Sequence, residues 1–210
     1  MPAHYLGESD PAKPGRYILP PDHWRTETRG DAEVTVVHET LPGHHLQIAL
    51  TQELAAKAPL LRIALTGAYV EGWARYAERL AEELNIYQTD YARITRRAWM
   101  ARGMVVDPGI HMFGWSREKA IAYLVESGRF DASSASDMLD RIAVVPGQLT
   151  AYDSGGLEIA ALRAETEQAL GRCFDLKTFH LRLLSGGALP LKALRANMAQ
   201  WREQAKAACR

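Results

Sequence analysis

Apolar residues recur at intervals of three and four along most of the chain, which is the periodicity of amphipathic helices. The strongest such segment covers residues 60–84, where alanine, valine and leucine side chains share one face. Further helices are predicted over residues 32–57 with an interruption at Pro42-Gly43, and over residues 90–104, 116–126, 134–144, 147–170, 175–184 and 190–208. The β-branched run Val34–Val37 is expected to be helical, because β-branching lowers helix propensity only slightly. The predicted fold class is therefore mainly α.

Glycine and proline interrupt this pattern in three zones, which are residues 7–23, 103–116 and 185–190. The first zone is typical of a loop with at most a short strand around residues 17–19, so the β structure expected there is a small hairpin. Residues 1–30 are accordingly a Pro/Gly-rich N-terminal segment. Residues 31–210 are predicted to form one helical domain, as the length of 210 residues also indicates.

Composition narrows the function classes. The 25 Lys+Arg residues balance the 25 Asp+Glu residues, so bulk charge gives no reason to expect nucleic acid or an anionic membrane as a partner. No apolar run approaches the ~20 residues of a membrane span, and Met1–Asp10 lacks the pattern of a signal peptide. Cys173 and Cys209 can form one bridge, but nothing in the sequence requires it. A reducing, cytoplasmic location is therefore expected.

One short stretch, HETLPGHH at residues 38–45, carries a specific chemical signal. Zinc hydrolases commonly place two His residues one turn apart on a helix, with a Glu beside the first. Two neutral imidazoles then hold the metal, and the carboxylate takes a proton from water. A helix end with surface histidines is the alternative, but four candidate ligands within eight residues make it the weaker one.

The spacing of these histidines does not suit one straight helix. At ~100° per residue His44 lies ~120° from the face of His38, and His45 returns to that face ~10.5 Å farther along the axis. Pro42 removes a backbone donor, and Gly43 permits unusual dihedral angles. Either the Pro-Gly pair breaks the helix and turns a second histidine back toward His38, or the stretch is not a metal site.

A third metal ligand is expected in the most apolar helix. Glu71 lies there among alanines and aromatic residues, where a carboxylate is costly to bury unless it is paired or bound to metal. Glu78 shares its face two turns later, so one of the two carboxylates can reach the ion while the other orients a histidine. For Glu78 a solvated stripe with Arg75 and Arg79 is an equally good interpretation.

Five stretches carry a family resemblance: HETLPGHHLQ, EGWARYAERL, VDPGIHMFGWSREKAI, PGQLTAYDSGG and FDLKTFH. In this order, from about residue 5 to residue 202, they resemble the bacterial family called domain of unknown function 885. The resemblance implies a Zn2+-dependent peptidase of the thermolysin-like type whose third ligand is Glu. It implies His38, His44 and Glu71 as ligands and Glu39 as the general base.

The resemblance also bears on the organisation of the protein. Members of that family are usually more than twice as long, with a large helical part before the metal motif. The chain is therefore expected to correspond to the C-terminal catalytic part. It is then either a catalytic fragment or a compact variant, or a homo-oligomer or a partner chain replaces the missing N-terminal half.

Downstream polar residues complete the candidate site. His111 and Tyr152 are expected to face the metal, where an imidazole or a phenol hydroxyl can stabilise negative charge on an amide oxygen. The alternatives are a loop histidine bonded to Asp107 and an ordinary core tyrosine. A run of arginines over residues 93–102 is interpreted as a solvated helix face, although an inward-pointing one could hold a substrate carboxylate.

These residues together predict a zinc-dependent hydrolase of peptide or small amide bonds. Glu39, Tyr152 and His111 are the predicted catalytic residues. Two alternatives keep the same motif: a metal-dependent hydrolase or biosynthetic enzyme acting on a non-peptide ester or amide, and a non-catalytic half of an oligomeric complex.

Overall fold

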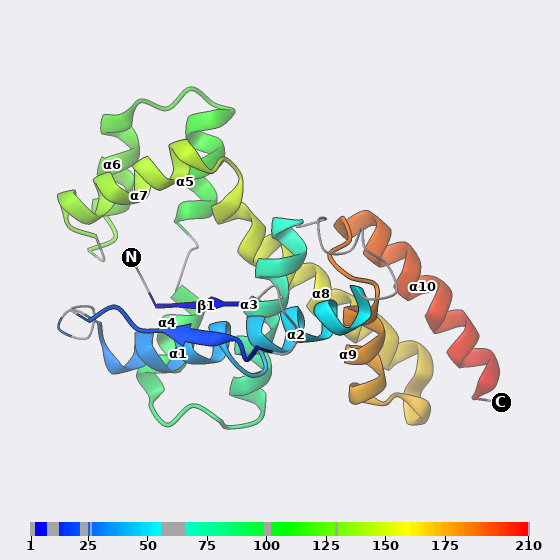
Figure 1. Cartoon of the computed structure of the whole chain (residues 1–210). Coiled ribbons are helices and arrows are strands. Elements are labelled where there is room, and N and C mark those ends of the chain that lie inside the picture. The colour runs from blue at the N-terminus through cyan, green and yellow to red at the C-terminus, as the bar shows by residue number, and fades with distance from the viewer. Residues whose placement is uncertain are drawn as a thin grey trace.

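The computed structural model describes residues 3–7, 13–21, 25, 27–55, 66–98, 102–128 and 130–209. These residues form a helical assembly with one short hairpin (Figure 1). The elements in chain order are β1 (His4–Leu6), β2 (Arg16–Ile18), α1 (Arg29–Glu39), α2 (His44–Ala55), α3 (Gly67–Glu83), α4 (Asp90–Ala98), α5 (Gly103–His111), α6 (Arg117–Val125), α7 (Ala132–Val144), α8 (Gln148–Leu170), η3 (Gly171–Cys173), α9 (Leu176–Ser185) and α10 (Leu191–Ala208). Predicted helical residues 56–57, 60–65 and 99–101 lie outside the described part.

The mainly α prediction is confirmed. The β-branched run Val34–Val37 is helical within α1, and strands β1 and β2 pair antiparallel, with Tyr5 opposite Tyr17. Side-chain caps fix several helix starts, since each accepts an orphan backbone N–H of the first turn. The predicted cap Ser116 accepts from the amide of Lys119, and Asp131 begins α7 in the same way. Within the described residues, no helix is both long enough and apolar enough to span a bilayer.

The zone predicted to be an interruption at residues 103–116 is largely helical, and that prediction was wrong for its first nine residues. Helix α5 runs from Gly103 to His111 with Pro108 inside it. Its Val106 is fully buried against the side chains of α6, α7 and α8. The free energy gained by this burial offsets the cost of the backbone hydrogen bond that Pro108 cannot donate. Gly109 marks close packing rather than a helix end, because an added Cβ would lie 2.7 Å from the Trp115 ring.

Helices α3 and α8 cross at a glycine contact that brings their backbones close together. A Cβ on Gly72 would lie 2.5 Å from the backbone of Gly155, and one on Gly155 would lie 1.7 Å from the carbonyl oxygen of Ala68. Figure 1 shows α8 as the long helix that joins the group α5–α7 to the group α9–α10. Side chains of α3 and α8 on one side of the crossing, including Trp73 and Ile159, pack with α9 and α10 to form the main core.

A disulfide joins Cys173, in the turn after α8, to Cys209 at the end of α10. The sequence permitted this bridge without requiring it. Disulfides are typical of oxidising compartments, so the pair does not favour the cytoplasmic location expected from the sequence, which stays a prediction.

Candidate metal centre

The turn between α1 and α2 brings two histidines together. Helix α1 ends at Glu39 and α2 begins at His44, with a cis peptide bond between Leu41 and Pro42. Gly43 is packed so closely on the end of α1 that an added Cβ would lie 1.9 Å from the carbonyl oxygen of His38. The rings of His38 and His44 consequently lie edge to face, with centroids 4.7 Å apart. The predicted break in the helix therefore occurs at Pro42-Gly43.

The structure also distinguishes between the two candidates for the second histidine. His44 is buried and lines the same cavity as His38. The ring of His45 instead contacts the ring of Tyr5, with centroids 5.1 Å apart. His44 is thus the histidine that the turn directs toward His38.

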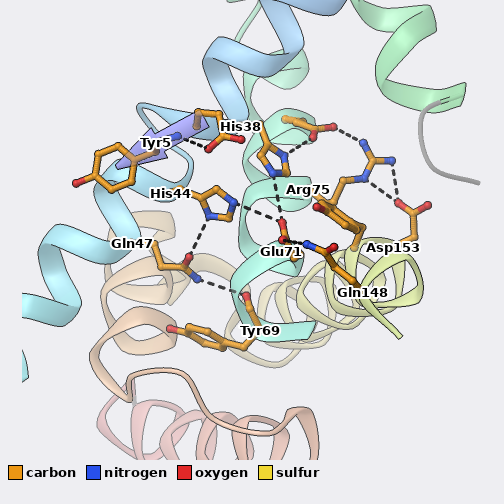
Figure 2. Close-up of polar contacts among 12 residues, drawn as sticks. Tyr5, His38, His44, Gln47, Tyr69, Glu71, Arg75, Gln148 and Asp153 are labelled. Carbon is orange, nitrogen blue, oxygen red and sulfur yellow. Dashed lines mark hydrogen bonds and ion pairs between the residues drawn. The ribbon is translucent and has the colours of Figure 1, made fainter. Parts of the chain in front are cut away.

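Glu71 of α3 faces both histidines (Figure 2). Its Oε2 atom lies 3.4 Å from Nε2 of His38 and 3.4 Å from Nε2 of His44. This oxygen is buried and accepts no hydrogen bond within the described part of the chain. A buried carboxylate oxygen in that position is costly unless a cation compensates it.

The three atoms suit a zinc ion in both separation and chemistry. Two ligand atoms that share a tetrahedral zinc, with bonds of ~2.0–2.1 Å, lie ~3.3–3.4 Å apart. The observed separations of 3.4 Å between Glu71 Oε2 and each imidazole Nε2 match this value. Two imidazoles and one carboxylate are also a donor set found in catalytic zinc sites. The residues present therefore fit the metal.

A second layer of contacts fixes which nitrogen of each imidazole faces Glu71. Glu78 is fully buried and lies 2.8 Å from Nδ1 of His38, so its carboxylate accepts the Nδ1 proton. On His44, Nδ1 lies 3.4 Å from the amide oxygen of Gln47, whose own NH₂ group donates to the carbonyl of Tyr69. When the two rings are neutral, both Nε2 lone pairs are thereby directed toward Glu71, as in metal-binding histidines.

Glu78 has the orienting role that the sequence left open between it and a solvated stripe. Arg75 pairs with the other oxygen of Glu78 and donates at 2.8 Å to Asp153 of α8. Because Arg75 also donates to the carbonyl of Arg96, its guanidinium ties α3 to α4 and α8. The buried charge of Glu78 is therefore compensated by a cation that three elements hold in place.

The electrostatics of the cluster show how strongly it attracts positive charge. Burial alone would lower the pKa of His38, but the close contacts with Glu71 and Glu78 and their negative charge raise the pKa to about 9. Burial would raise the pKa of Glu71, yet contacts with His38 and His44 hold that pKa far below its usual range. A proton is thus retained here when no other cation is bound.

Glu39 lies at the edge of the cluster, as expected for a general base. One ligand atom each of His38, Glu39 and His44 lies within 4.8 Å of the other two. The Oε2 atom of Glu39 accepts a hydrogen bond from the backbone N–H of Tyr5 in β1 at 2.9 Å, so the hairpin holds this carboxylate from one side. Glu39 and Tyr5 both line a cavity of about 330 Å³ above the histidines.

Tyr152 reaches this cavity from α8, as predicted. Its ring centroid lies 5.9 Å from that of His38, and its hydroxyl accepts a hydrogen bond from Nη2 of Arg141 at 3.1 Å. Burial, followed by the charge of Glu71, raises the pKa of this phenol, so its proton is retained. Gln148, one helical turn earlier, donates to Glu71 at 3.5 Å.

His111 is not among the residues that line the cavity. Its Nε2 atom lies 3.1 Å from the carbonyl oxygen of Ile142 and 3.7 Å from Asp107. This is the bonded arrangement with Asp107 that the sequence offered as the alternative. The physical reason is that residues 103–111 form helix α5, which packs on α6 and α8 in place of a loop over the metal cluster.

The arginine run of residues 93–102 does not supply a cavity cation among the described residues. Arg96 and Arg97 both pair with Glu82, and Arg93 pairs with Asp90. Sequence reasoning missed Arg141, Gln148 and Gln47. Two of them carry a signal in hindsight, because Gln47 lies three residues after His44 and Gln148 four residues before Tyr152, which are spacings that share a helix face.

The family model for the bacterial protein of unknown function DUF885 matches residues 2–198. This chain belongs to the DUF885 family. Solved structures resemble it, among them two bacterial proteins. One is described as the putative lipoprotein from Colwellia psychrerythraea, with 35% identity and a TM-score of 0.89 over 97% of this chain. The other, a putative lipoprotein of unknown function from Shewanella oneidensis, has 28% identity and a TM-score of 0.79 over 94% of this chain.

This DUF885 chain spans only part of the length of those two proteins. The match covers 36% of the Colwellia chain and 39% of the Shewanella chain. A search of curated proteins finds no match to the sequence. The comparisons thus show the family and the fold, and the descriptions of these relatives name no activity.

Proposed function

We propose that this DUF885 chain is a zinc-dependent hydrolase that cleaves amide bonds in peptides or small amides. The observation that carries the proposal is the approach of two imidazole Nε2 atoms to one buried oxygen of Glu71, each at 3.4 Å. Their Nδ1 atoms are engaged by Glu78 and Gln47, so three lone pairs face one another. A metal cation is the group that satisfies all three at once.

The residues around this position divide into ligands and reacting groups. His38, His44 and Glu71 would hold zinc, which lowers the pKa of water and polarises a substrate carbonyl. Glu39 is the general base that takes one proton from the attacking water while the water oxygen bonds to the carbonyl carbon. Glu39 then delivers that proton to the amide nitrogen as the carbon–nitrogen bond breaks.

Tyr152 is placed to stabilise the negative charge that develops on the amide oxygen. Its hydroxyl keeps its proton, since burial and the Glu71 charge raise its pKa. The same hydroxyl accepts from Arg141, which fixes its position and makes it a stronger donor. Positioned donors of this kind commonly contribute about 10²–10³ in rate.

The size of the cavity is consistent with a small substrate. Its volume is about 330 Å³, at the lower end of the ~300–1,000 Å³ range of ligand pockets. One wall consists of Ala3, His4 and Tyr5 of the N-terminal hairpin segment. Because the related structures are longer, a homo-oligomer or a partner chain that completes this cavity stays part of the proposal.

Replacement of the general base gives a direct test of the function. Glu39→Gln should leave zinc binding by His38, His44 and Glu71 intact and lower kcat/KM toward a quenched-fluorescence peptide panel by about 10²–10⁴. Glu53→Gln, which changes an exposed carboxylate on α2, serves as the matched control. Unchanged turnover in the Glu39→Gln protein would contradict the proposed mechanism.

A further inference from the structure

Arg141 lines the same cavity as His38, His44 and Glu71. It comes from α7, whereas those three residues belong to α1, α2 and α3. Its guanidinium is held in place along one edge. Nε donates to the amide oxygen of Gln148 at 3.0 Å, and Nη2 donates to the hydroxyl of Tyr152 at 3.1 Å. Both partners are neutral, so neither compensates the arginine charge.

The pairing of Arg141 differs from that of most other arginines that the structure describes. Arg75, Arg163 and Arg195, for example, each face two carboxylates. No carboxylate of the described residues lies within ion-pair distance of Arg141. A guanidinium has five N–H donors, and Gln148 and Tyr152 accept two of them. The fork formed by Nη1 and Nη2 therefore has donors left for a ligand.

We propose that Arg141 binds a carboxylate of the substrate beside the scissile amide. This inference rests on the proposed function and names the substrate class for the same site. A carboxylate matches the planar fork of a guanidinium through two parallel N–H···O bonds. Arg141 is also the single Lys or Arg side chain among the cavity-lining residues that the structure describes. Glu39 and Glu71 would otherwise repel an anion from this cavity.

Tyr152 connects Arg141, the proposed carboxylate-binding residue, to the histidines of the proposed metal centre. Arg141 donates to the Tyr152 hydroxyl, and the Tyr152 ring lies 5.9 Å from the His38 ring. One peptide residue spans about 3.3–3.6 Å, so a carboxylate one residue beyond the scissile carbonyl can contact Arg141 while that carbonyl lies beside Tyr152. A free C-terminal carboxylate and an acidic side chain share this chemistry.

Equilibrium binding to the Glu39→Gln protein tests Arg141 independently of hydrolysis. The probes are acetyl-dialanine with a free carboxylate, its C-terminal amide, and an acetyl-glutamyl-alanine amide, titrated by calorimetry with and without zinc. The free acid is expected to bind about 10- to 100-fold more tightly than its amide. The preference should vanish in Arg141→Gln and persist in part in Arg141→Lys. Arg117→Gln is the control, because Arg117 is an exposed arginine of α6.

Each outcome bears on the proposal. Tight binding of the glutamyl amide in place of the free dipeptide assigns the site to an acidic side chain and still supports Arg141. Equal affinity for acid and amide, no binding of any of the acidic probes, or a preference that survives in Arg141→Gln overturns it. A preference that survives in Arg141→Gln would indicate that the carboxylate binds zinc. Failure of the proposed function is recognised separately, because wild-type protein would then bind the free acid without hydrolysing any of the peptides.

Discussion

Glu78 accepts the Nδ1 proton of His38 at 2.8 Å from a fully buried position on α3. The same imidazole presents Nε2 to Glu71, which lies seven residues earlier on that helix. His38 thus lies between two carboxylates of α3 that are two turns apart. Glu71 faces the nitrogen that would bind a metal, and Glu78 fixes the orientation of the ring. This relationship makes Glu78 part of the cluster, although it contacts only the side of His38 that faces away from Glu71.

Glu78→Gln is therefore expected to weaken zinc binding by about 10- to 100-fold, the range usual for the loss of a carboxylate behind a ligating histidine. The neutral amide can still accept a hydrogen bond, but it makes His38 a poorer donor to the metal. Competition with a fluorescent zinc chelator measures the affinity. Glu83→Gln on the same helix removes a surface ion pair with Arg79 and Arg163 and should leave the affinity unchanged. Equal losses in both variants would contradict the role of Glu78.

The glycine crossing of α3 and α8 is expected to be intolerant of a methyl group. Gly155→Ala should lower the free energy of unfolding by about 2–3 kcal/mol, because the added Cβ would lie 1.7 Å from the carbonyl oxygen of Ala68 and the helices must separate. Gly67→Ala is the matched control, since its Cβ would meet Ala151 at 3.7 Å, an ordinary contact. Urea unfolding measures both. A Gly155→Ala protein as stable as Gly67→Ala would show that the helices do not pack this closely.

His180 should make the stability of the fold depend on pH. Burial, followed by the charge of Arg163, lowers its pKa to about 4, and Tyr76 contacts its Nε2 atom at 2.8 Å. An unfolded histidine titrates near ~6.5, so between pH 6.5 and 4 the unfolded state binds a proton that the folded state does not. The free energy of unfolding should therefore fall as the pH is lowered through this range, by an amount on the order of 1–3 kcal/mol.

Urea unfolding at pH 7 and pH 4.5 measures this dependence. His180→Phe keeps an aromatic ring beside Trp73 and Tyr76 and removes the titrating group, so the difference in pH dependence between the two proteins isolates His180. The variant should lose less stability than wild type on acidification. Identical pH dependence in the two proteins would contradict the lowered pKa.

The sequence predicts most of the helices because their periodicity and caps are local. Ser116 shows this, since its hydroxyl needs only the amide three residues later. Residues 103–111 were misjudged because Pro108 and Gly109 are local signals, whereas the burial of Val106 depends on α6, α7 and α8.

The residues of the candidate site also divide into those that the sequence indicates and those that depend on tertiary packing. The proximity of His38, Glu39, His44 and Glu71 was predictable, because few residue types can hold a metal or move a proton and these four stand in the two relevant segments. Arg141 was not, because it is 70 residues from Glu71 in sequence and reaches the cavity only through the packing of α7 on α8. His111 was expected at the site on its residue type, but the helix that carries it packs elsewhere.

Metal stoichiometry shows whether His38, His44 and Glu71 hold a zinc ion. Elemental analysis of protein purified without chelator should give about one zinc per chain for wild type and for His45→Ala, whose ring contacts Tyr5. His44→Ala, which removes one of the two nitrogens facing Glu71, should lose that zinc. No tightly bound metal in wild type after zinc is supplied, or equal loss in the two histidine variants, would contradict a metal centre built from His38, His44 and Glu71.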